Sequence, residues 1–373
     1  MSRVLTLCSA AAVLAATGAF AQMSRNNQSG HNQAASNPCA CMEQGMGLPT
    51  EKKCFPAAYN APASIAVSCG WDFDISASFL YWYVSEEGLD AAHAAPGLSP
   101  PATPNTGAVA YQDFSYQPGF QVAVGYNTGY DDWTASLQYT WMHQSVSTTY
   151  GAPRALGTGG AGSWLGNDWF VVSPGNTATT ALSTGWKMNM DMLDLFFSRP
   201  YYQGTQLTVS PYGGIRALWI RQAFNVDLTD VAALNPTAKA KSNSWAIGAA
   251  TGADIHWLLG MGFRFEGNAT GALLYTQYTT IGWKQSRTDT SGATASTTDY
   301  SAVRPVAQLG LGLGYGSYLY CQKFYVDFSA RYDFNYFWNQ NVMRPFVSEL
   351  AGRENDRGDL SMHGLTLNAR FDF

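Results

Sequence analysis

The chain has 373 residues, and its aromatic residues (14%) outnumber its charged residues (13%), a balance that does not suit a soluble enzyme with a charged surface. The net charge of −5 provides no basic surface for nucleic acid, which is therefore not an expected partner. No run of 18 or more apolar residues follows the N-terminal stretch, so transmembrane helices are excluded.

The N-terminus has the pattern of a secretory signal. Arg3 supplies the positive charge, residues 4–16 are apolar, and Ala19-Phe20-Ala21 forms an A-x-A cleavage site. We predict a signal peptide over residues 1–21 and export of the remaining chain. Residues 22–68 are rich in Asn, Gln, Ser, Ala and Pro without a sustained period, and they are predicted to form a disordered periplasmic leader.

From Trp71 onward, apolar and polar residues alternate with the period of a half-buried β-strand. In the fourth alternating segment the apolar phase shifts by one residue, which predicts a β-bulge near Met192. The ten predicted strands cover residues 71–84, 114–127, 133–141, 186–197, 207–220, 244–257, 263–275, 309–316, 324–338 and 364–373.

The connections between these strands alternate in length. Four short turns are predicted near 128–131, 199–204, 258–261 and 319–323, and five long loops near 85–113, 145–183, 223–243, 281–300 and 339–357. Transmembrane barrels combine short periplasmic turns with longer extracellular loops. Residues 168–172 can contribute to one further strand pair, which would make twelve strands.

Charged residues avoid one face of all ten segments. The aromatic-rich phase contains no Asp, Glu, Lys or Arg, whereas the opposite phase carries most of the charge. Arg or Lys at mid-bilayer on a lipid-facing wall costs about 2–4 kcal/mol, so this face suits lipid. A soluble β-sandwich also keeps its core free of charge, but the signal sequence, the alternating connections and the Trp and Tyr at strand ends favour the membrane. Residues 69–373 are therefore predicted to form an all-β, antiparallel, up-and-down transmembrane β-barrel.

The charges of the opposite phase are candidates for lining a pore. The alternative is a salt-bridge network that fills the bore. The glycine-rich inner phases at 244–252 and 310–316 have two interpretations: tight curvature, or space for solute or for a folded-in loop such as 145–183. The candidate pore-lining residues are Asp72, Asp74, Lys187, Asp191, Arg216, Asp254, Arg264, Glu266, Asp327, Arg331 and Asp333.

Five cysteines remain after the signal sequence, and disulfides are permitted in an exported protein. An odd number leaves a free thiol or a bond to another chain. Barrel closure can bring Cys69 near Cys321; the alternative is bonding of the leader cysteines to neighbouring chains. The candidates are Cys39, Cys41, Cys54, Cys69 and Cys321. The spacing of the first two does not fit a zinc site, and no metal or other cofactor is expected.

Two histidines near the predicted outer rim, His143 and His363, leave a rim-active hydrolase as a minor alternative. Neither lies in a motif with a nucleophile and an orienting carboxylate. No enzymatic activity is therefore expected.

The final strand alternates up to Phe373 and resembles the closing strand of bacterial outer-membrane barrels, whose terminal Phe is read by the assembly machinery. An ordered set of motifs covering about residues 69–373 also resembles the pore-forming family typified by the Legionella major outer membrane protein, with relatives in environmental chlamydiae. The motifs are WDF (71–73), FLYW (79–82), LTVSPYGGIRALWIRQ (207–222), WLLG (257–260), FWNQN (337–341) and HGLTL (363–367), followed by Ala369-Arg370-Phe371.

The resemblance implies an abundant outer-membrane porin, sometimes cross-linked by disulfides and exposed to host surfaces. It does not cover the leader and supplies no catalytic residues. We expect a passive channel for small hydrophilic solutes and ions in the bacterial outer membrane, with a plugged structural or adhesin-like barrel as the alternative. Expected partners are outer-membrane lipid, the assembly machinery through Phe373, and identical or disulfide-linked neighbours.

Overall fold

The computed structural model describes residues 70–373 except 96–107, 129–130, 153–162, 166–168, 172–178, 231, 289, 321 and 353–356, together with residues 63, 65 and 67. These residues belong to one compact unit that begins at Lys53. The predicted signal peptide, nearly all of the leader and the candidate cysteines Cys39, Cys41, Cys54, Cys69 and Cys321 lie outside the described residues.

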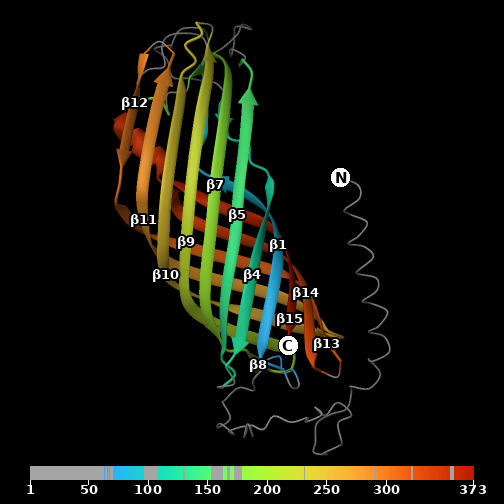
Figure 1. The fold of residues 1–373 in the computed structure, drawn as a ribbon. Helices are drawn as coiled ribbons and strands as arrows, with labels where there is room; N and C mark the ends of the chain where they lie inside the picture. The colour runs from blue at the N-terminus through green and yellow to red at the C-terminus, as the bar shows by residue number, and fades with distance from the viewer. Residues whose placement is uncertain are drawn as a thin grey trace, which may run out of the picture. The chain divides into compact units, whose positions relative to one another are not determined.

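Ten long antiparallel strands form a closed barrel, as predicted (Figure 1). Each strand pairs with the next long strand along the chain, and the last pairs with the first. The wall strands are β1 (Phe73–Glu86), β4 (Tyr116–Asn127), β5 (Thr134–Tyr150), β7 (Thr179–Ser198), β9 (Leu207–Asp230), β10 (Thr237–Gly260), β11 (Phe263–Arg287), β13 (Tyr300–Leu319), β14 (Phe324–Asn341) and β15 (Gly358–Asp372).

The remaining elements lie in the connections. The short strands β2 (Asp90–Ala95), β3 (Val109–Tyr111) and β6 (Ser163–Leu165) form a separate three-stranded sheet. Strand β8 (Tyr201–Gln203) pairs with β9, β12 (Thr290–Thr297) pairs with β11, and helix α2 (Met343–Leu350) precedes the last strand. The alternative of twelve wall strands is wrong, because Trp169, Phe170 and Val171 lie outside any strand and the first two are buried.

The outer wall carries the apolar phase of the strands. Large side chains such as Leu311, Val303 and Phe265 are 74%, 63% and 51% exposed, as expected for a surface in contact with lipid. Aromatic side chains mark one edge of this belt, where Trp219 pairs in register with Trp245 and the Trp245 ring lies 6.2 Å from that of Tyr275. No helix among the described residues is long and apolar enough to cross a membrane.

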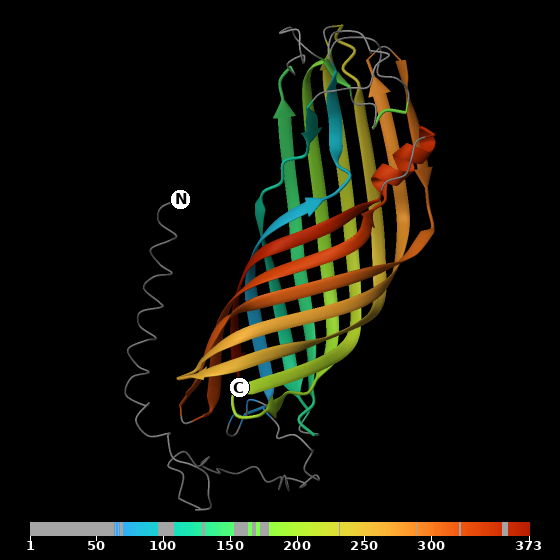
Figure 2. The ribbon, with the colours of Figure 1, turned by 180° about the vertical axis from the view of Figure 1, so that it is seen from behind.

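Several strands continue far beyond the predicted ends. Strands β9 and β10 have 24 residues each and β11 has 25, although spanning a bilayer needs only about 9–11. They rise together on the near side of Figure 1, while the opposite wall is shorter (Figure 2). Most of the predicted loops 223–243 and 281–300, and both ends of the predicted loop 145–183, are therefore strand.

The β-bulge predicted near Met192 is wrong. Strand β7 keeps its register with both neighbours through this region, and its register shift lies between Thr179 and Ala181. The apparent change of phase has another cause, because in this part of β7 the apolar residues lie on the inward face. Trp186, Met188 and Met192 face the interior, where the lining of the barrel changes from polar to apolar.

Candidate functional site

The interior of the barrel has two halves of opposite character. Toward the short turns, the inward positions of the strands are mostly polar or charged; toward the long connections they are mostly apolar, with buried polar side chains such as Glu86, Gln222 and Arg304 among them. In β1 the inward side chains change from Asp74, Ser76 and Ser78 to Leu80 and Trp82. The same change occurs in β9, β11, β14 and β15.

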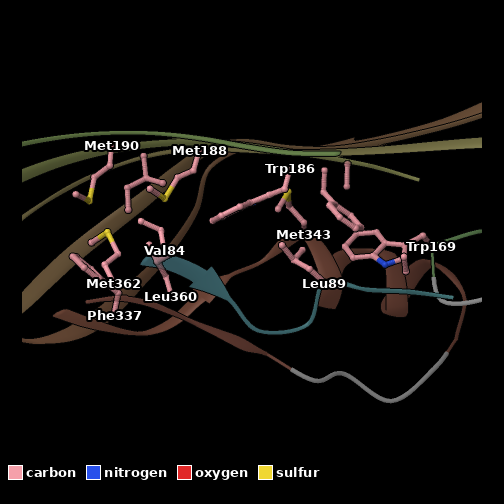
Figure 3. Packing of buried hydrophobic residues seen from close by; sticks show 14 of the residues in the cluster. Val84, Leu89, Trp169, Trp186, Met188, Met190, Phe337, Met343, Leu360 and Met362 are labelled. Carbon is pink, nitrogen blue, oxygen red and sulfur yellow. The ribbon is translucent and has the colours of Figure 1, made fainter. Parts of the chain in front are cut away.

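Segments from three connections fill the apolar half. We call them the plug: the sheet β2–β3–β6, residues 169–170 and helix α2. Leu89, Trp169 and Met343 pack in one cluster with the wall residues Trp186 and Met188, and all five are buried (Figure 3). Strand β6 and residues 169–170 supply part of this filling, and β2, β3 and α2 supply the rest.

Specific contacts orient the plug. The indole of Trp283 in β11 donates a hydrogen bond of 2.9 Å to the Trp169 carbonyl, and the Trp169 indole donates one of 2.7 Å to the Asp90 carbonyl. Arg344 in α2 forms an ion pair with the Asp90 carboxylate at 2.9 Å and lies over the Trp169 ring. The ring of Trp169 also lies 4.7 Å from that of Phe224 in β9. Trp169 is therefore the central contact between the plug and the wall.

A cavity of about 190 Å³ lies in the polar half of the barrel. Charged and amide side chains from several strands line it, including Arg216, Asp254, Gln308, Arg331 and Asp333. Trp82 and Met192 are also in the lining, so the cavity ends where the apolar half begins. Its chemistry suits water, ions and small polar solutes rather than an apolar ligand.

Arg216 makes a contact across the interior. Its guanidinium donates hydrogen bonds of 2.7 and 2.9 Å to both carboxylate oxygens of Asp194 in β7, and one of 2.8 Å to Gln308 in β13. Two strands, β10 and β11, separate β9 from β13 in the wall. Sequence analysis missed Asp194 and Gln308, although the alternation of Leu193 and Leu195 around Asp194 places it on the inward phase.

A second charged group lies nearer the short turns. Arg264 in β11 pairs with Glu266 on the same strand and with Asp327 in β14. Asp327 also accepts a hydrogen bond of 3.3 Å from the Tyr325 hydroxyl. In the same region Arg331 lies 3.6 Å from Asp333. The predicted inward charges of β11 and β14 thus form two sets of ion pairs, one around Arg264 and one between Arg331 and Asp333.

Two further predicted residues have polar partners inside the wall. Asp254 in β10 accepts a hydrogen bond of 2.6 Å from Asn268, which also donates to the Tyr212 hydroxyl at 2.9 Å. Asp74 lies 3.4 Å from Arg370 in β15, close to the C-terminal end of the chain.

Three predicted residues do not lie inside the bore. Asp72 precedes β1 and is exposed. Lys187 and Asp191 lie on the outer face of β7, because the strand continues without the predicted bulge and Met188 and Met190 occupy the inward phase. Asp191 accepts a hydrogen bond of 2.7 Å from the Tyr139 hydroxyl of the neighbouring strand.

The inward glycines of β13 make room for long side chains of the neighbouring strands. A methyl group on Gly312 would lie 2.5 Å from Cγ of Arg331, and one on Gly314 would lie 2.9 Å from the Arg264 guanidinium carbon. The space is therefore occupied by the charged network rather than by a folded-in loop.

The two rim histidines are on the outer face. His143 Nε2 lies 3.4 Å from Asp191, and His363 Nδ1 lies 2.6 Å from the Tyr332 hydroxyl within a group of aromatic rings. Within the described part of the chain, no group of three or more His, Cys, Asp or Glu side chains is placed to hold a metal ion.

The family of the chain follows from a match over residues 67–373 to the family described as Legionella pneumophila major outer membrane protein precursor. The chain belongs to this family. The match covers the whole barrel, so the protein is a bacterial outer-membrane β-barrel of the Legionella major outer membrane protein family. A comparison with curated proteins found no match.

Solved outer-membrane proteins show a weaker likeness. A major outer membrane protein from Thermus thermophilus is 12% identical, with a TM-score of 0.31 and coverage of 81% of this chain and 99% of that chain. The protease OmpT from Escherichia coli is 6% identical, with a TM-score of 0.35 and coverage of 83% and 99%. A Pseudomonas aeruginosa FadL homologue is 10% identical, with a TM-score of 0.27 and coverage of 81% and 90%.

Proposed function

We propose that the protein is an outer-membrane channel for small hydrophilic solutes and ions, and that the plug is its gate in the closed position. The observation that carries this proposal is the division of the interior: wall strands hold a polar cavity, while segments from the connections fill the bore beyond it. A filling that belongs to connections can move without opening the hydrogen-bonded wall. Its removal would join the polar cavity to the outside.

The closed position blocks ions for a physical reason. An apolar constriction excludes water, and a small ion cannot cross a section in which it loses its hydration shell without replacement. Trp186, Met188 and Met190 provide such a section together with Leu89 and Trp169. The charged groups of the polar half would then govern which ions enter once the plug moves.

A second candidate is a permanently plugged structural barrel. The contact of Arg216 with Asp194 and Gln308 favours it, because this side chain crosses the polar half and narrows any passage. The two candidates differ in one property: a gate opens at some voltage or after loss of a plug contact, whereas a permanent filling stays closed.

Single-channel recording of the purified protein in planar bilayers distinguishes them. The wild type should show discrete conductance steps that persist after deletion of residues 22–68. Trp169→Ala should spend more time open, because it removes the contacts of the indole to the Asp90 carbonyl, the Phe224 ring and the Arg344 guanidinium. Trp219→Ala on the outer wall is the matched control and should gate like the wild type.

Absence of steps in the wild type and in Trp169→Ala, with both proteins folded by heat-modifiable gel mobility, would refute the channel and leave the structural barrel. A rim hydrolase would require an activity that depends on His143 or His363, and we propose none.

We further propose that residues 1–21 direct export and that the assembly machinery reads the end of the chain at Phe373. Cross-linking to neighbouring copies through Cys39, Cys41 or Cys54, and a Cys69–Cys321 bond, stay predictions. Non-reducing electrophoresis of outer-membrane fractions, with and without these cysteines, tests both.

A further inference from the structure

A group of cations lies on the outer wall of the barrel, away from the bore. Its members come from four neighbouring strands and are all exposed: Lys187, Arg221, Lys239, Lys241 and Lys284. None of them forms an ion pair with a described residue. We call this group the basic patch; strands β7, β9, β10 and β11 that carry it stand side by side on the near wall in Figure 1.

Strand register brings these side chains together. Ala223 in β9 is the partner of Lys187 on one side and of Lys241 on the other. Lys241 is in turn opposite Gly282 in β11, and its side chain lies over that glycine, with Cε 3.0 Å from the position a methyl group would take. Adjacent strands are about 4.8 Å apart, so the two lysines lie about 10 Å apart across a floor of small residues.

The patch contains an arrangement that is unfavourable without an anion. Lys239 and Lys284 are direct register partners in β10 and β11, and like charges in directly opposed positions destabilise a sheet. Two acids on the same outer surface, Asp191 and Asp227, accept hydrogen bonds from Tyr139 and from Asn225, and neither forms an ion pair with a cation of the patch. Within the described residues, the lysine pair therefore has no carboxylate partner, and an external anion would relieve the repulsion.

The position of the patch selects the kind of anion. Arg221 follows Trp219 by one outward step, and Lys241 and Lys239 lie two and three steps beyond Trp245, on the side of the long connections. Each step of two residues rises about 6.6 Å along the strand, or about 5 Å along the normal of the bilayer at a tilt of 45°. The cations thus lie about 5 to 15 Å above the aromatic girdle, in the layer of lipid headgroups and the sugars above it.

We propose that the basic patch binds the phosphate groups of a phosphorylated glycolipid in the extracellular leaflet. Lysine and arginine side chains beside the bilayer surface attract anionic headgroups, and several cations on one rigid wall can hold two phosphates of the same lipid. The acyl chains of that lipid would then lie against the apolar belt below Trp219 and Trp245. This binding does not depend on whether the barrel conducts.

The test measures binding of bisphosphorylated lipid A to the full-length protein in detergent by native mass spectrometry. Each cation near an anionic surface contributes about 1 kcal/mol, so Lys241→Gln should weaken binding about fivefold. The variant with all five cations replaced by glutamine should bind at least about a hundredfold more weakly. Lys323→Gln, an exposed lysine in the turn before β14, is the matched control and should bind like the wild type.

Two ligand controls separate lipid phosphate from other sources. Lipid A from which both phosphates have been removed should bind the wild type as weakly as the five-site variant binds the intact lipid. Inorganic phosphate at the same concentration should not displace the lipid. The proposal is overturned by unchanged affinity in the five-site variant, by equal binding of the dephosphorylated lipid, or by displacement with inorganic phosphate, which would leave an adventitious anion site only. Heat-modifiable gel mobility verifies that each variant is folded.

Discussion

Replacing Arg216 by leucine should destabilise the barrel by about 3–5 kcal/mol, because the change leaves Asp194 buried without its partner. The side chains of Arg216 and Asp194 are only 2% and 1% exposed, so the carboxylate depends on the guanidinium for its stabilisation. The variant also loses the hydrogen bond to Gln308, which contributes about 1 kcal/mol.

The double replacement Arg216→Leu/Asp194→Leu should be far milder. Exchange of a buried ion pair for apolar residues of similar volume is often neutral, so we expect the double variant to lie within about 2 kcal/mol of the wild type. The two single changes and the double change form a thermodynamic cycle that isolates the pair. Urea unfolding in lipid vesicles, followed by tryptophan fluorescence, gives the free energy of each variant.

The exposed pair of Arg199 and Asp131 serves as the control. Its side chains are 16% and 42% exposed and its atoms are 3.0 Å apart, so Arg199→Leu should cost no more than about 1 kcal/mol. If the double variant at Arg216 and Asp194 loses the sum of the two single effects, the pair has no coupling energy and our account of the polar half is incorrect.

Two further changes test the wall. Gly314→Val should cost about 1–3 kcal/mol through collision with the Arg264 guanidinium, whereas Gly271→Val, which has open space around its methyl position, should be nearly neutral in the same urea titration. In intact cells, a maleimide that cannot cross membranes should label the Lys187→Cys variant and should not label the Met188→Cys variant. Equal labelling of the two variants would contradict the assigned faces of β7.

The ten wall strands could be predicted from the sequence because the lipid-facing positions of each strand carry no charged residue over about ten residues. Phe79 and Tyr81, or Leu311 and Leu313, face lipid, and a charge at such a position is costly. The ends of the strands were predicted poorly. Beyond the girdle, Lys239 and Lys241 point outward while Ala238 and Ala240 point inward, so the rule that identified the strand no longer applies.

The candidate site was predictable only in part. Arg264, Glu266 and Asp327 follow the alternation of strands within the membrane, and they meet inside the bore. The composition of the plug was not predictable beyond the general hypothesis of a folded-in loop, because β2, β3, β6, residues 169–170 and α2 come from connections without a sustained period and are brought together by long-range packing. Strand β7 contained the one available sign of an apolar interior. Met188 and Met190 alternate with Lys187 and Asn189, and lipid does not face the side of a strand that carries such polar residues.

The two faces of the wall exchange roles at the height of the girdle. Below it the outside is apolar and the inside polar. Above it, next to Trp219 and Trp245, the outward residues become more polar and most of the inward residues become apolar, starting with Leu218 and Ala246. The projecting part of the barrel is thus built like a water-soluble β-barrel with its own core. Such a core needs its filling, since displacement of the plug would expose apolar wall residues such as Trp186 to water. The hydrophobic effect therefore keeps the plug in place, and in the proposed gate an opening stimulus has to supply the free energy of wetting that wall.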